Sequence, residues 1–284
     1  MKEILHNFML MHPLFQGTFI LYLFATLFPL IAVLIKLPRI KFFWIIITGG
    51  AFLLNTVLLT FRWIEAGRPP FKTLFETMIF YPWCVSFILF ILLAYYKAFF
   101  LLPFCNIIST VGFMYATVKP EIEYINLPPA LQSFWFIPHV IIYFLSYACL
   151  FCSFILATIA LLIQYDSIKN FLLKITKGTL INVNFEILCH SVLNLGFTAL
   201  TFGLVFGAVW GKIAWGDYWS WDPKENWALI TWLIYLSTIH LRYIPEFKSK
   251  VLLIVIILGF FAVVFTYLGM NLLPSAKSSL HVYQ

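Results

Sequence analysis

Residues 136–163, F-I-P-H-V-I-I-Y-F-L-S-Y-A-C-L-F-C-S-F-I-L-A-T-I-A-L-L-I, form an apolar run without Asp, Glu, Lys or Arg. A helix needs about 20 residues to cross a hydrocarbon layer about 30 Å thick, so this run is long enough to span a membrane. The chain is expected to be helical, because lipid offers no partners to unpaired backbone groups and the two-residue alternation of barrel strands is missing. The sequence therefore predicts an all-α polytopic membrane protein of about eight transmembrane helices, forming a single membrane domain over 1–284. The other seven runs lie at 17–35, 42–61, 75–96, 98–117, 187–209, 227–243 and 250–270.

Composition also places the chain in a bilayer. Of its 284 residues, 63% are hydrophobic and 10% are charged, whereas soluble domains carry about 25% charged residues. The formal net charge is +7, but Lys and Arg occupy short gaps between apolar runs, so nucleic-acid binding is not expected. All five cysteines lie inside apolar runs, so no disulfide framework is indicated. Pro29, Pro82 and Pro103 also lie inside the runs, where we expect kinked helices.

The charges between the runs predict the topology. One set of loops holds ten Lys/Arg and three Asp/Glu, whereas the remaining segments hold eight of each sign. Loops rich in Lys and Arg face the cytoplasm. Both termini, the segment 210–226 and the tail 271–284 are therefore expected on the extracytoplasmic side. The cation-rich loops are 36–41, 97, 164–186 and 242–250.

A tryptophan-rich segment stands out between the sixth and seventh runs, where residues 210–227 read W-G-K-I-A-W-G-D-Y-W-S-W-D-P-K-E-N-W. One interpretation is an aromatic belt at headgroup level, but a belt distributes its rings over all helix ends. The other is a binding surface, because broad indoles stack on a flat apolar ligand while a few charges meet its polar edge. A porphyrin with two propionates fits the second interpretation. The candidate contact residues are Trp210, Trp215, Trp219, Trp221, Asp222 and Trp227.

Porphyrin iron needs axial ligands, and neutral imidazole is the usual one. On the predicted topology His139 begins the fifth span and His281 lies in the outer tail, so both share a side with the Trp-rich segment. His240 closes the seventh span near the cytoplasmic face. It is either a ligand inside the membrane or a helix-terminal residue favoured by the helix dipole. His190 begins the sixth span at a similar depth and is a second candidate for the inner position.

The stretch W-G-D-Y-W-S-W-D-P-K-E-N-W resembles the signature of the tryptophan-rich "WWD" haem-handling proteins. Within that superfamily the chain is similar to the CcsA (ResC) component of System II cytochrome c biogenesis. The resemblance covers about residues 127–284, and G-R-P-P-F-K-T-L-F-E-T at 67–77 is similar to the family's loop before its third span. Three further stretches agree, namely L-Q-S-F-W-F-I-P-H-V, W-A-L-I-T-W-L-I-Y-L-S-T-I-H-L-R and G-M-N-L-L-P-S-A-K-S-S-L-H-V-Y.

The resemblance implies that His139 and His281 are outer haem ligands beside the Trp-rich loop and that His240 is a ligand within the membrane. A CcsB (ResB) partner would supply the second ligand in the membrane. This chain has His190 where family members have tyrosine, so the inner ligand pair stays open. Haem b is then the transported substrate, and the other partners are an apocytochrome c with a C-x-x-C-H motif and a thiol-reducing protein.

The function that the resemblance implies is haem transport and presentation to apocytochrome c for covalent thioether attachment, as part of a cytochrome c synthase. The membrane would be a bacterial cytoplasmic membrane or, alternatively, a thylakoid membrane. No catalytic residue is assigned, because thiol addition is chemistry of haem and its substrate. One alternative is a haem exporter or chaperone of the CcmC type without ligation, although that branch has fewer spans. The other is an electron carrier with resident b-haem, although such carriers pair their ligands within a helix bundle.

Overall fold

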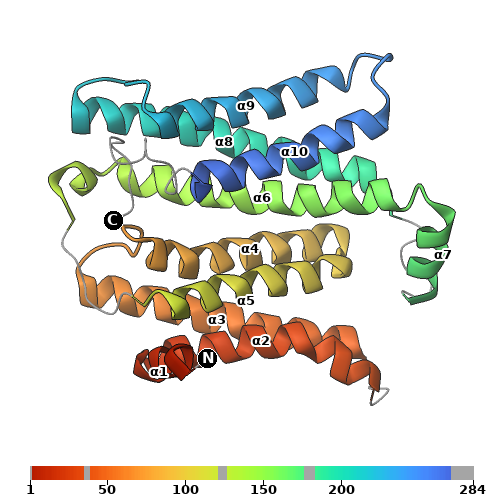
Figure 1. Ribbon diagram of the computed structural model, residues 1–284, viewed down its shortest axis with the longest axis horizontal. Helices are drawn as coiled ribbons and strands as arrows, with labels where there is room; N and C mark the ends of the chain where they lie inside the picture. Colours follow the sequence, from red (N-terminus) through yellow and green to blue (C-terminus); the bar gives the residue numbers. More distant parts are fainter. Residues whose placement is uncertain (1, 35–38, 121–126, 176–182, 270–284) are drawn as a thin grey trace. The chain divides into compact units, whose positions relative to one another are not determined.

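A computed structural model describes residues 2–34, 39–120, 127–175 and 183–269. These residues form helices joined by turns, and no strand occurs among them. They divide into two compact units, Met1–Gln132 and Ser133–Val282 (Figure 1). The all-α class is confirmed, and the single membrane domain over 1–284 stays a prediction.

The first unit is built from apolar helices that run in alternating directions along the chain (Figure 1). Within it, α2 packs on α3 and α5, and α4 packs on α3 and α5. The short α1 contacts α5. The helices are α1 (Lys2–Leu10), α2 (Pro13–Leu34), α3 (Ile40–Ala66), α4 (Leu74–Tyr96), the 3-10 turn η1 (Phe99–Leu101) and α5 (Leu102–Val118), followed by the 3-10 turn η2 (Pro129–Gln132).

Buried polar side chains join the helices of the first unit. Tyr22 and Ser86 hydroxyls lie 3.0 Å apart between α2 and α4. The Asn106 amide donates to Thr48 Oγ1 at 3.0 Å between α5 and α3. Without a hydrophobic driving force between helices in lipid, such bonds and close packing hold a bundle together.

Prolines mark two different positions in the first unit. Pro82 lies inside α4, as expected, and removes the N–H that would bond to Met78 O. A Cβ on Gly112 of α5 would lie 2.8 Å from Met78 O, so only glycine lets α5 approach this carbonyl. Pro103 lies instead in the first turn of α5. The expected internal kink is wrong there, because a first-turn proline lacks only an N–H that has no helical partner.

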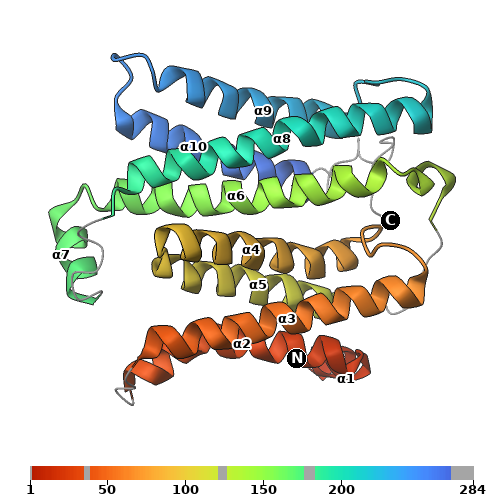
Figure 2. The same ribbon diagram turned by 180° about the vertical axis from the view of Figure 1, so that it is seen from behind.

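The second unit centres on α6, which packs on both α8 and α10. Figure 2 shows α8 running beside α6, and α8, α9 and α10 all lie on the same side of α6. Ser146 Oγ of α6 donates to Gly196 O of α8 at 2.7 Å, and Trp232 Nε1 of α9 donates to Thr201 Oγ1 of α8 at 2.9 Å. The helices are α6 (Phe136–Leu162), α7 (Asp166–Ile175), α8 (Phe185–Trp215), α9 (Pro223–Leu241) and α10 (Ser249–Tyr267).

Every predicted apolar run coincides with a helix, and six of the described helical segments are long and apolar enough to cross a membrane. The chain is thus an integral membrane protein. The run 17–35 corresponds to α2 and the run 227–243 to α9, whose first turn carries Lys224 and Glu225. That these two helices also span the membrane stays a prediction, as does the side on which the termini lie. The six segments are Ile40–Ala66, Leu74–Tyr96, Phe99–Val118, Phe136–Leu162, Phe185–Trp215 and Ser249–Tyr267.

Candidate haem-handling site

His139 lies in the first turn of α6, where its ring is held by α8. Its Nδ1 lies 2.9 Å from the Gly203 carbonyl oxygen. A carbonyl oxygen only accepts, so Nδ1 carries the proton and Nε2 carries the lone pair of the neutral imidazole. A second nitrogen bonded to a backbone carbonyl is the usual arrangement of a metal-ligating histidine, because it fixes the tautomer and the ring orientation.

Two glycines of α8 make room for this arrangement. A Cβ on Gly207 would lie 2.6 Å from His139 Cε1, and a Cβ on Gly203 would lie 2.5 Å from Cδ2 of Tyr143. Both distances are far below van der Waals contact. The imidazole and the neighbouring phenol ring therefore rest directly on the α8 backbone. The edge-to-face contact of His139 with Tyr143, at 4.8 Å between centroids, adds a second restraint on the ring.

Indoles adjoin the same histidine. The Trp210 ring lies 5.4 Å from the His139 ring and 4.8 Å from the Trp215 ring, measured between centroids. Trp210 is 3% exposed and is also packed against Phe136. The structure therefore brings His139, Trp210 and Trp215 together, as a single aromatic cluster between α6 and α8.

The loop itself is shorter than the sequence suggested. Helix α8 continues through Trp215, so the first six residues of the 210–226 segment are helical. Gly216 ends the helix with φ 92°, a conformation that favours glycine, and its N–H donates to Lys212 O at 3.2 Å. The Lys212 ammonium donates back to Gly216 O. Between the two helices, only residues 216–222 form the loop.

Within this loop the two central tryptophans differ. Trp221 is 71% exposed and holds φ 59°, a left-handed backbone that is uncommon for a bulky residue. Trp219 packs edge-to-face on Trp221 at 6.2 Å, and its buried Nε1 has no hydrogen-bond partner in the part of the chain that the structure describes. Strained backbone and unsatisfied donors are each costly, and both are typical of binding sites.

Asp222 has a structural role that the sequence interpretation missed. Its carboxylate accepts the Lys224 N–H at 2.8 Å and caps α9. Glu225 reciprocates by accepting the Asp222 N–H at 3.2 Å and the Ser220 N–H at 2.9 Å. Pro223 occupies the first helical position, where proline is favoured. The letters D-P-K-E thus spell a capping box, and Asp222 contributes to the site by fixing the end of the loop.

Two neighbours complete this end of the loop. Burial lowers the pKa of the Lys224 amine to about 8, against the opposing effect of the Asp222 carboxylate. An anion placed beside this amine would raise its pKa again. Trp227 turns away toward α10, where its ring lies 4.3 Å from the Phe265 ring. Trp227 therefore packs between helices and does not belong to the loop cluster.

The two inner histidines differ in exposure. His240 is exposed near the end of α9, and its Nδ1 lies 2.8 Å from Leu236 O, so Nδ1 again carries the proton and Nε2 the lone pair. His190 is 6% exposed and lines a pocket between α8 and α10 that His240 does not line. His281, the expected second outer ligand, lies outside the described residues.

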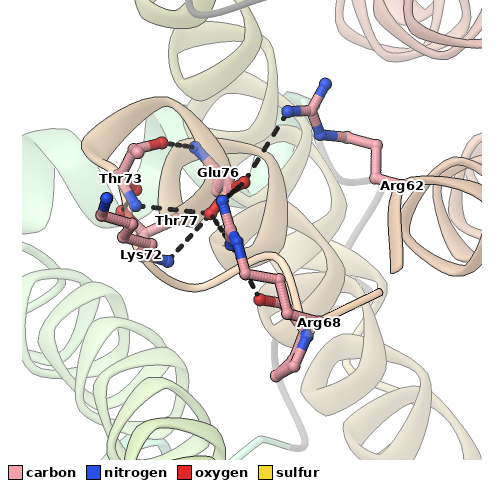
Figure 3. A network of polar contacts seen from close by, with 7 residues as sticks. Arg62, Arg68, Lys72, Thr73, Glu76 and Thr77 are labelled. Carbon is pink, nitrogen blue, oxygen red and sulfur yellow. Dashed lines mark hydrogen bonds and ion pairs between the residues drawn. The ribbon is translucent and has the colours of Figure 1, made fainter. Parts of the chain in front are cut away.

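A second polar cluster occurs in the first unit, which we call the arginine–glutamate cluster (Figure 3). Arg68 binds both carboxylate oxygens of Glu76 at 2.9 Å each, and Arg62 approaches the same carboxylate at 3.7 Å. Glu76 also accepts the backbone N–H of Lys72 at 2.8 Å and forms a capping box with Thr73 at the start of α4. The sequence interpretation reached only the likeness of 67–77 to a family loop.

The sequence carried signals for the residues that were missed. G-L-V-F-G at 203–207 is a G-x-x-x-G spacing, which is typical of close helix contacts in membranes. T-L-F-E at 73–76 and D-P-K-E at 222–225 are both capping-box patterns that precede an apolar run. The capping boxes predict where α4 and α9 begin, and the glycine spacing predicts a close approach of another helix to the α8 backbone. The first pattern accounts for the position of Asp222, and the second for that of His139.

Comparison with known proteins gives consistent results. The family model "Cytochrome C assembly protein" matches residues 71–276. The chain is 35% identical over 257 residues to "Cytochrome c biogenesis protein CcsA" of Chlamydomonas reinhardtii, covering 86% of this chain and 68% of the relative. It is 36% identical to the CcsA of Marchantia polymorpha, covering 79% of this chain and 82% of the relative. For the CcsA of Prochlorococcus marinus the identity is 33%, with 80% of each chain covered.

A solved structure shares the fold. The chain titled "Cytochrome c Heme Lyase CcmF" superposes with a TM-score of 0.64 at 16% sequence identity. The match covers 88% of this chain and 45% of that one, so the present chain corresponds to less than half of its length. At this identity the likeness establishes the fold alone.

Proposed function

The chain belongs to the cytochrome c assembly protein family, in its CcsA branch, and on that premise we propose that it carries haem across the membrane and presents it to apocytochrome c. Its role in cytochrome c maturation follows from the family. The proposal adds the path of haem b as substrate, the residues that hold it, and the covalent thioether attachment that completes the task.

The observation that carries the proposal is the setting of His139. Its proton is on Nδ1, bonded to Gly203 O, so Nε2 has the lone pair that ferrous haem iron needs. The Trp210 ring packs beside this imidazole, and the Trp215 ring packs on Trp210. Trp219 and Trp221, in the loop that follows, offer indole faces for the porphyrin plane. His281 is the proposed second outer ligand.

The loop also offers polar groups for the propionate edge of haem. The buried N–H of Trp219 lacks an acceptor among the described residues, and a propionate oxygen would supply one. A propionate beside the Lys224 amine would raise the lowered pKa of this amine again. Both groups lie at the Trp-rich loop. This loop thus suits a planar, apolar ligand with one acidic edge.

Attachment requires no change of oxidation state in the thioether step. The S–H of an apocytochrome cysteine adds across a haem vinyl group: a C–S bond forms, and the hydrogen goes to the other vinyl carbon. Two imidazoles on the iron would limit the access of oxidants to ferrous haem. A thiol-reducing partner keeps the cysteines reduced. The protein contributes placement and protection of the haem.

The inner position in the proposal is held by His240. Its imidazole is exposed on α9, so a histidine from a CcsB (ResB) partner can approach the same iron. His190 is buried among other residues and is the weaker candidate. The membrane is proposed to be a bacterial cytoplasmic membrane or, alternatively, a thylakoid membrane, since the relatives come from an alga, a plant and a cyanobacterium.

The test compares haem content in the purified protein, co-expressed with its partner. His139→Ala should lower outer-site haem occupancy at least tenfold, with partial recovery on adding imidazole, because the small molecule can fill the vacated coordination position. Gly207→Ala should have a similar effect, because its Cβ would occupy the position of the imidazole. The control is Gly50→Ala in α3, where an added Cβ meets nothing within 4 Å.

Haem spectra and transfer to an apocytochrome peptide distinguish the alternatives. Transfer with thioether formation supports the proposal. Retention of haem without transfer would identify an electron carrier, and release of haem without ligation would identify an exporter. Unchanged spectra in both His139→Ala and Gly207→Ala would remove His139 from the site.

A further inference from the structure

A pocket of about 200 Å³ lies in the second unit, at the end opposite the Trp-rich loop. The start of α8 and the turn from α9 to α10 meet there, at one end of the unit (Figure 2). Its wall includes His190 and Glu186 of α8, Arg242 after α9, and Ser249 at the start of α10. Apart from His190, the weaker candidate for the inner haem ligand, no residue of the proposed haem site lines this pocket.

Two polar atoms in the wall lack partners. His190 is 6% exposed, and its buried Nδ1 has no hydrogen-bond partner among the described residues. The buried Ser249 hydroxyl is likewise without a partner in the described chain. An unsatisfied buried polar group destabilises the protein when nothing binds to it. His190 and Ser249 both line the pocket, so a hydrogen-bonding ligand bound there would lie next to both residues.

The charges around the pocket favour an anion. Arg242 is exposed at the mouth and makes no ion pair within the described residues. Ser249 is the first residue of α10, a 19-residue helix whose N-cap, Lys248, provides no side-chain cap. The N–H groups and the dipole at this helix start attract negative charge. The side-chain oxygen of Asn184, which also lines the pocket, already accepts a hydrogen bond from the Ile187 N–H at 3.0 Å.

We propose that this pocket binds a phosphate group. A tetrahedral oxyanion can accept from the Arg242 guanidinium, the His190 ring N–H, the Ser249 hydroxyl and the start of α10 together. Among the described residues of the wall, Glu186 is the one carboxylate, and its charge opposes binding. The loops that form the pocket belong to the cation-rich set, so the phosphate is either that of an anionic lipid headgroup or a soluble phosphate.

The test measures binding to the full-length protein in detergent, with two probes in separate arms: inorganic phosphate and short-chain phosphatidylglycerol. Arg242→Gln should weaken binding at least tenfold in whichever arm binds. Glu186→Gln should tighten it several-fold, because a repelling charge is removed. The control is Arg39→Gln, which removes the same charge from a cation-rich loop outside the pocket and should change nothing.

The two arms identify the source of the phosphate. Arg242-dependent binding of inorganic phosphate indicates a soluble ligand, and Arg242-dependent binding of phosphatidylglycerol alone indicates a lipid. His190→Phe should weaken the same arm, because it removes the ring N–H while keeping an aromatic ring there. The proposal is overturned if Arg242→Gln and Arg39→Gln behave alike in both arms. It is also overturned if Glu186→Gln weakens binding, since the pocket would then prefer a cation.

Discussion

Two capping boxes start helices in this molecule, and they are used differently. In the first unit, Thr73 and Glu76 open α4, and Glu76 is 2% exposed and bound by Arg68 in two hydrogen bonds. In the second unit, Asp222 and Glu225 open α9. Among the described residues, Glu225 accepts side-chain hydrogen bonds only from Ser220 and Asp222, which both lie in the loop. The local sequence pattern is the same, but the surroundings are not.

The difference shows how one motif produces either a rigid or an adaptable loop. Glu76 accepts hydrogen bonds from the Arg68 guanidinium and from the backbone N–H groups of Lys72 and Thr73, so both ends of segment 68–73 are tied to α4 (Figure 3). At α9 the capping box fixes only the end of the loop, while Trp219 and Trp221 project from its middle. Trp221 is 71% exposed whereas Arg68 is 7% exposed, so the loop before α9 is the less restrained of the two.

The largest expected effect is a reporter that is either active or inactive, and it tests on which side of the membrane the two loops lie. Both capping boxes are predicted to lie on the extracytoplasmic side. A periplasm-active reporter fused after Gly67, after Ser220 or at Gln284 should therefore be active, and one fused at residue 174 should be inactive. Reversed activities would invert the topology, and opposite activities at Gly67 and Ser220 would separate the two loops.

The largest energetic difference is expected between the two glutamates. Glu76→Ala leaves buried Arg68 and half-buried Arg62 without their carboxylate, which should cost about 3–5 kcal/mol of unfolding free energy. Glu225→Ala should cost about 1 kcal/mol or less, because it removes loop hydrogen bonds near solvent. Denaturant unfolding in detergent, followed by circular dichroism, measures both values. Equal losses would mean that the surroundings of the two boxes do not matter.

The next effect tests the rings of the adaptable loop. Replacing Trp219 and Trp221 together with leucine should lower haem affinity by on the order of 1 kcal/mol per stacked ring, about fivefold each. Trp44→Phe and Trp63→Phe serve as controls. Trp44 donates to Ala25 O inside the first unit, and Trp63 is 43% exposed on α3. Equal losses of haem in all variants would favour the aromatic-belt interpretation.

The smallest effect separates the cap from the charge of Asp222. Asp222→Ala should lower stability by about 1 kcal/mol, since the N-cap acceptor is lost. Asp222→Asn should preserve stability, because asparagine caps equally well. If haem retention also survives in Asp222→Asn, the residue acts by positioning the loop. Haem loss with unchanged stability in this variant would instead indicate direct contact of the carboxylate with haem.

Much of the fold follows from hydropathy, since the run 136–163 corresponds almost residue for residue to α6, Phe136–Leu162. Hydropathy failed where a helix leaves the apolar region. Helix α8 continues through Gly211 to Trp215, six residues past its run, and Gly216 ends it in the left-handed conformation. The ten-residue α7 was missed because an amphipathic helix is too polar and too short to resemble a span.

The sequence predicted which residues belong to the candidate site, but not how these residues are arranged in space. His139 lies at the start of α6 and Trp210 near the end of α8. Only the packing of α6 on α8 places their rings 5.4 Å apart. The role of Asp222 was visible in the D-P-K-E spacing, yet a haem signature and a capping box share those letters. A short sequence pattern therefore identifies the residues of a candidate site, but it does not say what each residue does there.

The bond between His139 and Gly203 makes the α8 backbone a reporter on the imidazole. When a metal withdraws electron density through Nε2, the proton on Nδ1 becomes more acidic and its bond to the carbonyl oxygen strengthens. The stretching frequency of a carbon-13-labelled carbonyl at Gly203 should then fall. A single infrared label, placed inside the helix and away from the porphyrin, would thus register the arrival and the departure of haem in real time.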